Sequence, residues 1–141
     1  QVADTLAKEG YRTVFFGGSM DEDMVREAVA FMKSKPMIAT GKFSLGELAA
    51  AMSRCSLIIT NDSGPMHVAI SQKVPIVAMY GPSHPELYGP YTRLASIVRA
   101  DPPCDGCRKG MKHHCDDMRC MRDLTVQQVL KAAHRWLSRK K

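Results

Sequence analysis

The stretch Thr60–His67, with the sequence TNDSGPMH, places an acid, a hydroxyl, a glycine and a histidine between an apolar run and a helical pattern. The apolar run at 57–59 has the character of a buried strand, and the pattern after Gly64 is typical of a helix. A helix N-terminus offers unpaired N–H groups and the positive end of a dipole, and glycine lets a ligand approach the backbone closely. Ser63 adds a hydroxyl donor, so this turn is suited to hold a phosphate group.

His67 lies about one helical turn beyond Ser63 and Gly64, so the three residues share one face of the predicted helix. A neutral imidazole can donate one hydrogen bond, and a protonated one offsets phosphate charge. Asp62 repels a bare phosphate, so it suits a helix cap, a sugar hydroxyl or the orientation of His67. The structural alternative stays open: Asp62 or Ser63 only caps the helix, and His67 is an ordinary core or surface histidine.

The elements that must position this turn alternate between strand and helix along the chain. Helical patterns are expected before Gly10, over 21–34, from Ser44 with a capping box to Glu47, over 64–71, and after Thr125 as N-cap. Strands are expected in the runs RTVFFGG, PMIATG, LIITND, PIVAMYG and ASIVRA. These runs are continuously apolar rather than alternating, which predicts an α/β fold with a parallel sheet covered by helices on both faces.

Ligands of such sheets bind beyond the carboxyl ends of the strands. We expect four strand ends to meet at one edge of the sheet and to form a single ligand-binding mouth there. Each end is small, polar or rich in glycine: 17–19, 40–43, 61–64 and 81–83. Lys42 offers a cation for phosphate, and Phe43 offers an apolar face for a base. Gly17, Gly18 and Gly81 also have a structural explanation, because tight turns favour glycine.

The bulk properties fit a single globular domain of 141 residues with a net charge of +6 and a pI near 9.2. The charge permits anionic partners, although the basic tail RWLSRKK also suits a solvated helix end. No apolar run approaches the roughly 18 residues of a membrane span. The polar opening QVADTLAKEGY argues against a signal peptide, and without an initiator Met the chain is expected to be a piece of a longer protein.

Four of the five cysteines gather in a short segment that has no apolar periodicity and also contains His113 and His114. Zinc accepts four thiolates, or three thiolates and an imidazole, in tetrahedral geometry. A structural zinc, one or two disulfides, and reduced thiols all stay open, while an extracellular disulfide scaffold is disfavoured by the odd count. Cys55 is expected to be a small buried hydrophobe. The candidate zinc ligands are Cys104, Cys107, Cys115 and Cys120.

Three motifs together resemble glycosyltransferase family 9, the lipopolysaccharide heptosyltransferases. They are SLGELA at 44–49, NDSGPMH at 61–67 and PIVAMYGPS at 75–83. The similarity runs from about Val14 to the final helix, and the cysteine-rich segment also looks like one common in this family. The resemblance implies the C-terminal half of a GT-B enzyme: one Rossmann-like nucleotide-sugar-binding domain over 1–141, with a Cys-rich loop at 101–123 and a C-terminal helix at 124–141.

The same resemblance implies roles for individual residues around an ADP-heptose-type donor. Phe43 would lie by the adenine, and Asp21 or Glu22 would contact the ribose. Lys42, Gly17, Gly18 and Gly81 would complete the donor site. The diphosphate and the sugar would be held by Asp62, Ser63, Gly64 and His67.

The implied reaction is an inverting transfer in lipopolysaccharide core synthesis that needs no cofactor or bound metal. A base in a missing N-terminal domain would deprotonate a heptose or Kdo hydroxyl of a lipid-linked acceptor, which attacks the anomeric carbon as ADP leaves. No catalytic residue is therefore expected in this chain, which alone would bind donor weakly and be inactive. The resemblance also implies a cytoplasmic, bacterial protein, with peripheral contact at the inner face of the cytoplasmic membrane.

Two alternatives stay open. A basic, zinc-stapled α/β module could bind nucleic acid, as the pI and the CxxC pair permit. The chain has few aromatic residues and no interleaving of basic and aromatic side chains, so no nucleic-acid partner is expected. Another GT-B or epimerase-like domain could bind a UDP-sugar instead of an ADP-sugar.

Overall fold

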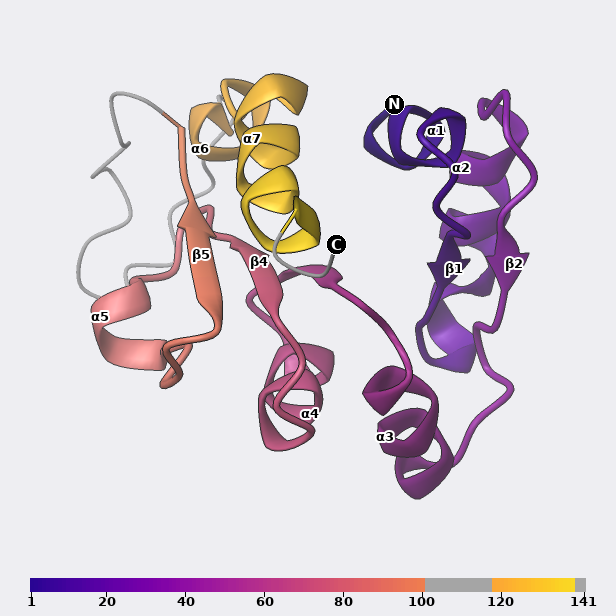
Figure 1. The fold of residues 1–141 in the computed structure, drawn as a ribbon, viewed down its shortest axis with the longest axis horizontal. Helices are drawn as coiled ribbons and strands as arrows, with labels where there is room; N and C mark the ends of the chain where they lie inside the picture. The colour runs from indigo at the N-terminus through magenta and orange to yellow at the C-terminus, as the bar shows by residue number, and fades with distance from the viewer. Residues whose placement is uncertain (101–117, 139–141) are drawn as a thin grey trace. The chain divides into compact units, whose positions relative to one another are not determined.

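The structure, a computed structural model, describes residues 1–100 and 118–138. These residues belong to two compact units, Gln1–Ala51 and Met52–Lys141, each of which is described by itself. Every strand pair in either unit is parallel, and helices lie between the strands in sequence (Figure 1). The predicted α/β class with parallel strands is therefore confirmed.

The first unit has a two-stranded sheet in which Val14 of β1 pairs with Met37 of β2. Helix α1 ends as predicted at a glycine: Gly10 has φ +92°, and the amide of Tyr11 donates to the carbonyl of Leu6 at 3.0 Å. The elements are α1 (Val2–Lys8), β1 (Val14–Phe15), the 3-10 helix η1 (Ser19–Asp21), α2 (Glu22–Ala30), β2 (Met37–Ile38) and α3 (Leu45–Ser53), which reaches into the second unit.

The second unit contains a three-stranded sheet in the order β3-β4-β5, with Asn61 opposite Met79 and Met79 opposite Val98. The central strand is its core, because Ile76, Val77 and Ala78 are fully buried. Helix α4 packs against β3 and β4, and α7 packs against β4 and β5. The elements are β3 (Ile58–Asn61), α4 (Gly64–Ser71), β4 (Ile76–Met79), α5 (Pro85–Tyr88), β5 (Ala95–Val98), α6 (Arg119–Arg122) and α7 (Val126–Leu137).

Both predicted N-caps are confirmed by their hydrogen bonds. The Ser44 amide and hydroxyl donate to the Glu47 carboxylate at 2.8 and 2.7 Å, and the Glu47 amide donates back to the Ser44 hydroxyl at 3.4 Å. The Thr125 hydroxyl accepts from the Gln128 amide, and the Gln128 side chain accepts from the Thr125 amide. Each pair satisfies orphan N–H groups at the start of its helix.

Two sequence expectations need correction. The segment 101–123 is expected to be an irregular loop, yet its described part holds the short helix α6, because Cys120 is buried and Met121 lies over Gly81. The strand expected in each apolar run is shorter than the run, with two to four paired residues. The four strand ends belong to two separate sheets, so their meeting at one mouth, and a single domain over 1–141, stay predictions.

Asp4 joins α1 to the segment that follows α2, and its hydrogen bonds predict a dependence of stability on pH. Its carboxylate accepts from the Ser34 hydroxyl and amide, both at 2.7 Å, and from the Lys33 amide at 3.0 Å. These hydrogen bonds, that of the Ser34 hydroxyl first, lower the pKa of Asp4 from 3.8 to about 2. The bonds therefore stabilise the folded state fully above pH 3.8 and are lost as the pH falls through about 2.

We expect an Asp4→Asn chain to unfold at a lower temperature than the unaltered chain at pH 7 and at nearly the same temperature at pH 2. Thermal unfolding followed by circular dichroism over this range would measure the difference. Glu27→Gln, at an exposed position on α2, is the matched control. A gap between the unaltered chain and the Asp4→Asn variant that does not change with pH would contradict the expectation.

Candidate functional site

The turn from β3 to α4 holds the residues that the sequence singled out first. Ser63 occupies the N-cap position in an extended conformation, with φ −157° and ψ 171°, and Pro65 lies in the first turn of α4. The Ser63 hydroxyl donates backward to the Asn61 side-chain oxygen at 3.2 Å and makes no hydrogen bond to the helix. Ser63 therefore makes no side-chain cap on α4. Pro65 has no N–H and the amide of Met66 donates to the Ser63 carbonyl at 3.0 Å, so among the first three residues of α4 it is Gly64 whose amide keeps its capacity for an external acceptor.

The surface of this turn is open. Gly64 is exposed, and a Cβ atom built on it would meet nothing within 4 Å. His67 is exposed one helical turn further along α4, and Asp62 and Ser63 are half-buried. The structure thus places these four predicted residues on one turn and the first turn of one helix. An anion there would meet the positive end of α4, a hydroxyl and an imidazole.

Behind the turn lies Tyr80, whose importance the sequence analysis did not recognise. Its side chain is fully buried, and its hydroxyl donates to the carbonyl of Gly89 and lies 3.4 Å from the sulfur of Met66 on α4. Burial first, and then the charge of Asp62, raises the pKa of Tyr80 to about 12. The phenol therefore stays a donor and ties the loop after β4 to the helix of the turn. The sequence signal that could have marked Tyr80 is the position of a tyrosine directly after an otherwise apolar strand.

Gly81, another predicted site residue, follows directly and is buried. A Cβ atom on it would lie 2.7 Å from the sulfur of Met121 and 3.5 Å from that of Cys120. The close approach of α6 therefore gives this glycine a structural reason, and its predicted contact with a ligand stays a prediction.

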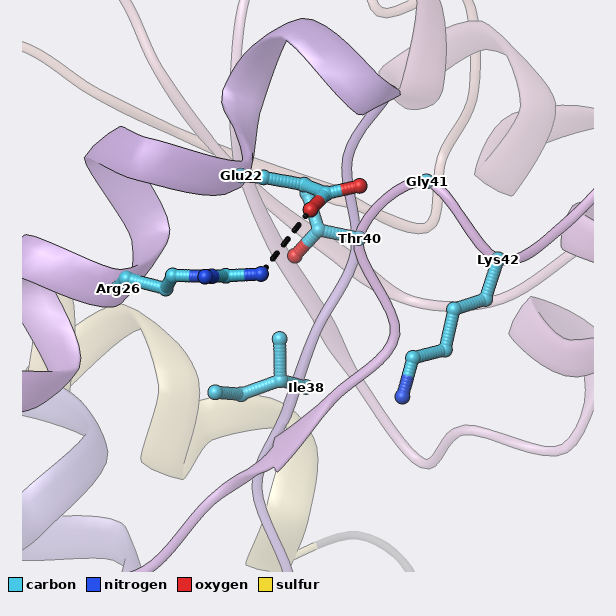
Figure 2. Close-up of a pocket in the computed structure, with 6 residues that line it drawn as sticks. All are labelled: Glu22, Arg26, Ile38, Thr40, Gly41 and Lys42. Atoms are coloured by element: carbon cyan, nitrogen blue, oxygen red, sulfur yellow. Dashed lines mark hydrogen bonds and ion pairs between the residues drawn. The ribbon is translucent and has the colours of Figure 1, made fainter.

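The remaining predicted site residues lie in the first unit, where two of them line a pocket of about 290 Å³ (Figure 2). Its six lining residues include Glu22 and Lys42 from the predicted set. Gly41 sits at the rim with φ +68°, a backbone conformation that favours glycine, and its amide donates to the carbonyl of Gly17 at 3.0 Å. The full lining is Glu22, Arg26, Ile38, Thr40, Gly41 and Lys42.

The structure separates the two acids that the sequence left as alternatives. The Asp21 carboxylate accepts from the amide of Gly18 at 2.8 Å, so it is used in holding its own turn. The Glu22 carboxylate lines the pocket, where one oxygen lies 3.3 Å from a guanidinium nitrogen of Arg26. Phe43 lies outside the pocket lining, 43% exposed, with its ring centroid 6.3 Å from that of Phe16.

The predicted metal ligands can be followed only in part. Cys104, Cys107 and Cys115 lie outside the described residues, while Cys120 is buried on α6. Within 1–100 and 118–138, no three His, Cys, Asp or Glu side chains gather in a way that could hold a metal ion. Cys55 is half-buried rather than buried, and burial raises the pKa of its thiol.

The helices of the described residues are all too short or too polar to cross a membrane. The longest of them, α7, has twelve residues.

Comparisons with known proteins point to one family. Residues 1–115 match the profile described as "Glycosyltransferase family 9 (heptosyltransferase)". The chain is 33% identical over 145 residues to "Lipopolysaccharide heptosyltransferase 2" of Salmonella typhimurium, with 98% of this chain and 40% of that protein covered. It is also 33% identical to the Escherichia coli protein of that name, over 78% of this chain and 33% of that protein.

Solved structures agree with the sequence matches. "The crystal structure of the glycosyl transferase family 9 from Veillonella parvula" superimposes with a TM-score of 0.86 at 51% identity, over 98% of this chain and 40% of that one. The "E. coli ADP-heptose lps heptosyltransferase II" superimposes with a TM-score of 0.83 at 30% identity, over 99% of this chain and 40% of that one. The chain therefore spans 33–40% of the length of these relatives.

Proposed function

Because this chain belongs to glycosyltransferase family 9, the heptosyltransferases, we propose that it is the donor-binding, C-terminal half of a GT-B heptosyltransferase. The donor is a nucleotide sugar of the ADP-heptose type. The names of the relatives, which include an ADP-heptose lipopolysaccharide heptosyltransferase, support this substrate class. The acceptor is a lipid-linked saccharide of the lipopolysaccharide core.

The observation that carries the proposal is the β3–α4 turn. The amide of Gly64 at the start of α4 receives no side-chain cap from Ser63, Gly64 leaves the approach open, and His67 is exposed one turn along. A diphosphate with its two adjacent negative groups matches this set of donors. Asp62, which would repel a phosphate, is suited to a hydroxyl of the sugar.

In the proposed reaction, an acceptor hydroxyl oxygen forms a bond to the anomeric carbon while the bond from that carbon to the diphosphate breaks. The hydroxyl proton passes to a base supplied by a part of the enzyme outside this chain. The leaving ADP gains negative charge, and the positive end of α4, the Ser63 hydroxyl and His67 stabilise that charge. No bound metal is required for this step, and the chain alone is inactive.

The full-length protein that contains this chain would therefore act on a membrane-linked acceptor from the cytoplasm, as a peripheral protein at the inner face of the membrane. Its further partner is its own acceptor-binding N-terminal domain. The candidate structural zinc at Cys104, Cys107, Cys115 and Cys120 belongs to this proposal as a support for the 101–123 segment.

Calorimetry with ADP, UDP and ADP-heptose tests the function. We expect the full-length protein to bind ADP more tightly than UDP, ADP-heptose at least as tightly as ADP, and an Asp62→Ala, His67→Ala variant to lose about tenfold or more in affinity for both ADP ligands. Thermal unfolding of the variant serves as the control for its fold.

Three results would count against the proposal. A preference for UDP would favour a UDP-sugar enzyme. A salt-dependent affinity for oligonucleotides without ADP binding would favour a nucleic-acid module. Unchanged ADP binding by the double variant would show that the diphosphate does not bind at the β3–α4 turn.

A further inference from the structure

Tyr91 is an exposed aromatic residue that the loop after α5 holds in one orientation. The residue is 73% exposed, yet its hydroxyl donates to the carbonyl of Leu87 at 2.6 Å. A Cβ atom built on Gly89 would lie 3.0 Å from Cδ2 and 3.2 Å from Cε2 of the Tyr91 ring. The ring is therefore fixed at its hydroxyl and along one edge, while most of its surface stays open to solvent.

The backbone around this ring is held by its own hydrogen bonds. The amide of Gly89 donates to the carbonyl of Pro85 at 3.1 Å, and the amide of Thr92 donates to the carbonyl of Pro90 at 2.9 Å. Gly89 has φ +83°, a conformation that favours glycine, and a larger residue there would also collide with the Tyr91 ring. Fixing an exposed side chain costs conformational entropy that burial does not offset, so this ring has the character of a surface organised in advance for a ligand.

This loop lies beside the β3–α4 turn, within the second unit. Strands β3 and β4 are parallel neighbours, so the segments that follow them leave the sheet at the same edge. Tyr80 connects these segments, because its hydroxyl donates to the carbonyl of Gly89 and lies 3.4 Å from the sulfur of Met66 on α4. Burial first, and then Asp62 and Tyr91, raise the pKa of that hydroxyl, as expected when both side chains lie near it.

The chemistry of this surface favours a saccharide. A pyranose has hydroxyl groups around its rim and an apolar face of C–H groups, and such a face packs on an aromatic ring. Asp62 on the neighbouring turn offers a carboxylate as acceptor for sugar hydroxyls. A membrane surface fits less well, because the exposed Glu86 of α5 carries a charge that anionic head groups repel. The Tyr91 hydroxyl, which could bind a head group, is already used by Leu87.

We propose that Tyr91 is a stacking residue for a pyranose ring of a saccharide substrate, beside the turn at which the diphosphate is proposed to bind. This inference rests on the proposed function and adds to it a residue that contacts the sugar through an apolar face. The pyranose belongs either to the transferred sugar of the donor or to the saccharide of the acceptor.

Three substitutions in the full-length protein test the inference. Tyr91→Leu keeps an apolar side chain but removes the flat ring, and Tyr91→Phe keeps the ring beside Gly89 but removes the hydroxyl. Tyr88→Leu removes an exposed ring from α5 itself and is the matched control. We expect Tyr91→Leu to weaken saccharide binding about tenfold, Tyr91→Phe to weaken it about threefold or less, and Tyr88→Leu to leave it unchanged. The affinity for ADP, which has no pyranose, should be the same in all three variants.

The ligands identify the source of the pyranose. Calorimetry uses ADP, ADP-heptose and a deacylated lipopolysaccharide core saccharide that ends in heptose or Kdo. If the transferred sugar stacks on Tyr91, Tyr91→Leu weakens ADP-heptose and not ADP. If the acceptor stacks on Tyr91, the same variant weakens the core saccharide and raises its KM, while kcat and the affinity for ADP-heptose stay the same. Either result supports the inference.

Several results would overturn the stacking role. Equal losses in Tyr91→Leu and Tyr91→Phe would show that the hydrogen bond to Leu87 matters and the ring does not. A loss that extends to ADP would show that the substitution disturbs the loop, and an equal loss in Tyr88→Leu would show a general apolar surface. A loss confined to binding of vesicles of phosphatidylethanolamine and phosphatidylglycerol would show a membrane contact instead.

The inference fails separately from the proposed function. If Tyr91→Leu binds ADP-heptose and the core saccharide as tightly as the unaltered protein, while the Asp62→Ala, His67→Ala variant loses ADP, the role of Tyr91 is overturned and the donor site stands. If the unaltered full-length protein binds neither ADP nor ADP-heptose, both proposals fall.

Discussion

A Gly64→Asp substitution is expected to abolish nucleotide binding without destabilising the fold. Gly64 is the first residue of α4, lies in open space and has no left-handed backbone conformation, so a side chain fits there. A carboxylate at this end of a helix interacts favourably with the dipole, typically by about 0.3–1 kcal/mol. The same charge stands where the diphosphate is proposed to bind, and its repulsion is expected to weaken ADP about hundredfold or more.

Gly64→Asn is the matched control, because asparagine has the shape of aspartate without its charge. We expect Gly64→Asn to cost far less affinity than Gly64→Asp, and the difference between the two variants to shrink as salt is raised. Calorimetry with ADP measures the affinity, and thermal unfolding shows whether Gly64→Asp leaves stability unchanged or higher. Equal losses of ADP affinity in the two variants would show that the size of the new side chain, and not its charge, weakens binding. Undiminished ADP binding by Gly64→Asp would show that the diphosphate binds elsewhere.

The second large effect is expected at Trp136, the anchor of the final helix. Trp136 is buried, and its indole N–H donates to the Ser96 hydroxyl of β5 at 2.9 Å. Val129, Ala133 and Leu137 are buried on the same helix. Truncating a core tryptophan to alanine typically costs about 3–5 kcal/mol, a large share of the roughly 5–15 kcal/mol by which a domain is stable.

We therefore expect Trp136→Ala to leave the chain largely unfolded or to lower its denaturant midpoint strongly, as measured by urea unfolding. Trp136→Phe retains an aromatic ring and removes the donor, and Ser96→Ala removes the acceptor. Both should cost clearly less than the alanine variant. A Trp136→Ala chain within about 1 kcal/mol of the unaltered one would show that α7 contributes little to the core, contrary to its burial.

The parts of the fold that the sequence predicted well depend on local signals. The bounds Gly64–Ser71 of α4, the capping box of Ser44 and Glu47, and the N-cap Thr125 follow from residues within a few positions of one another. Strand lengths were overestimated, because pairing needs a neighbouring strand as well as an apolar run. Helix α6 was missed because its support, the packing of Cys120 and Met121 near Gly81, comes from a distant part of the chain.

The candidate site also has a part that local sequence motifs predicted and a part that depends on contacts between distant residues. The motifs predicted the family, which the comparisons confirm, and they marked the β3–α4 turn. They left Asp21 and Glu22 as alternatives for the ribose, and that choice stays a prediction; the structure adds that the Asp21 carboxylate accepts from the amide of Gly18 while Glu22 lines the pocket. They also did not mark Tyr80, because its buried hydrogen bond to the carbonyl of Gly89 becomes visible only when the packing around it is known.

The short sheet of the first unit has a consequence for local motion. Its strands pair over two residues each, both residues of β2 are exposed, and within 1–51 the buried residues are Leu6, Ala39 and Thr40. So little buried apolar surface makes this a segment that opens at a small fraction of the global free energy, and its amides exchange with solvent before those of β3, β4 and β5.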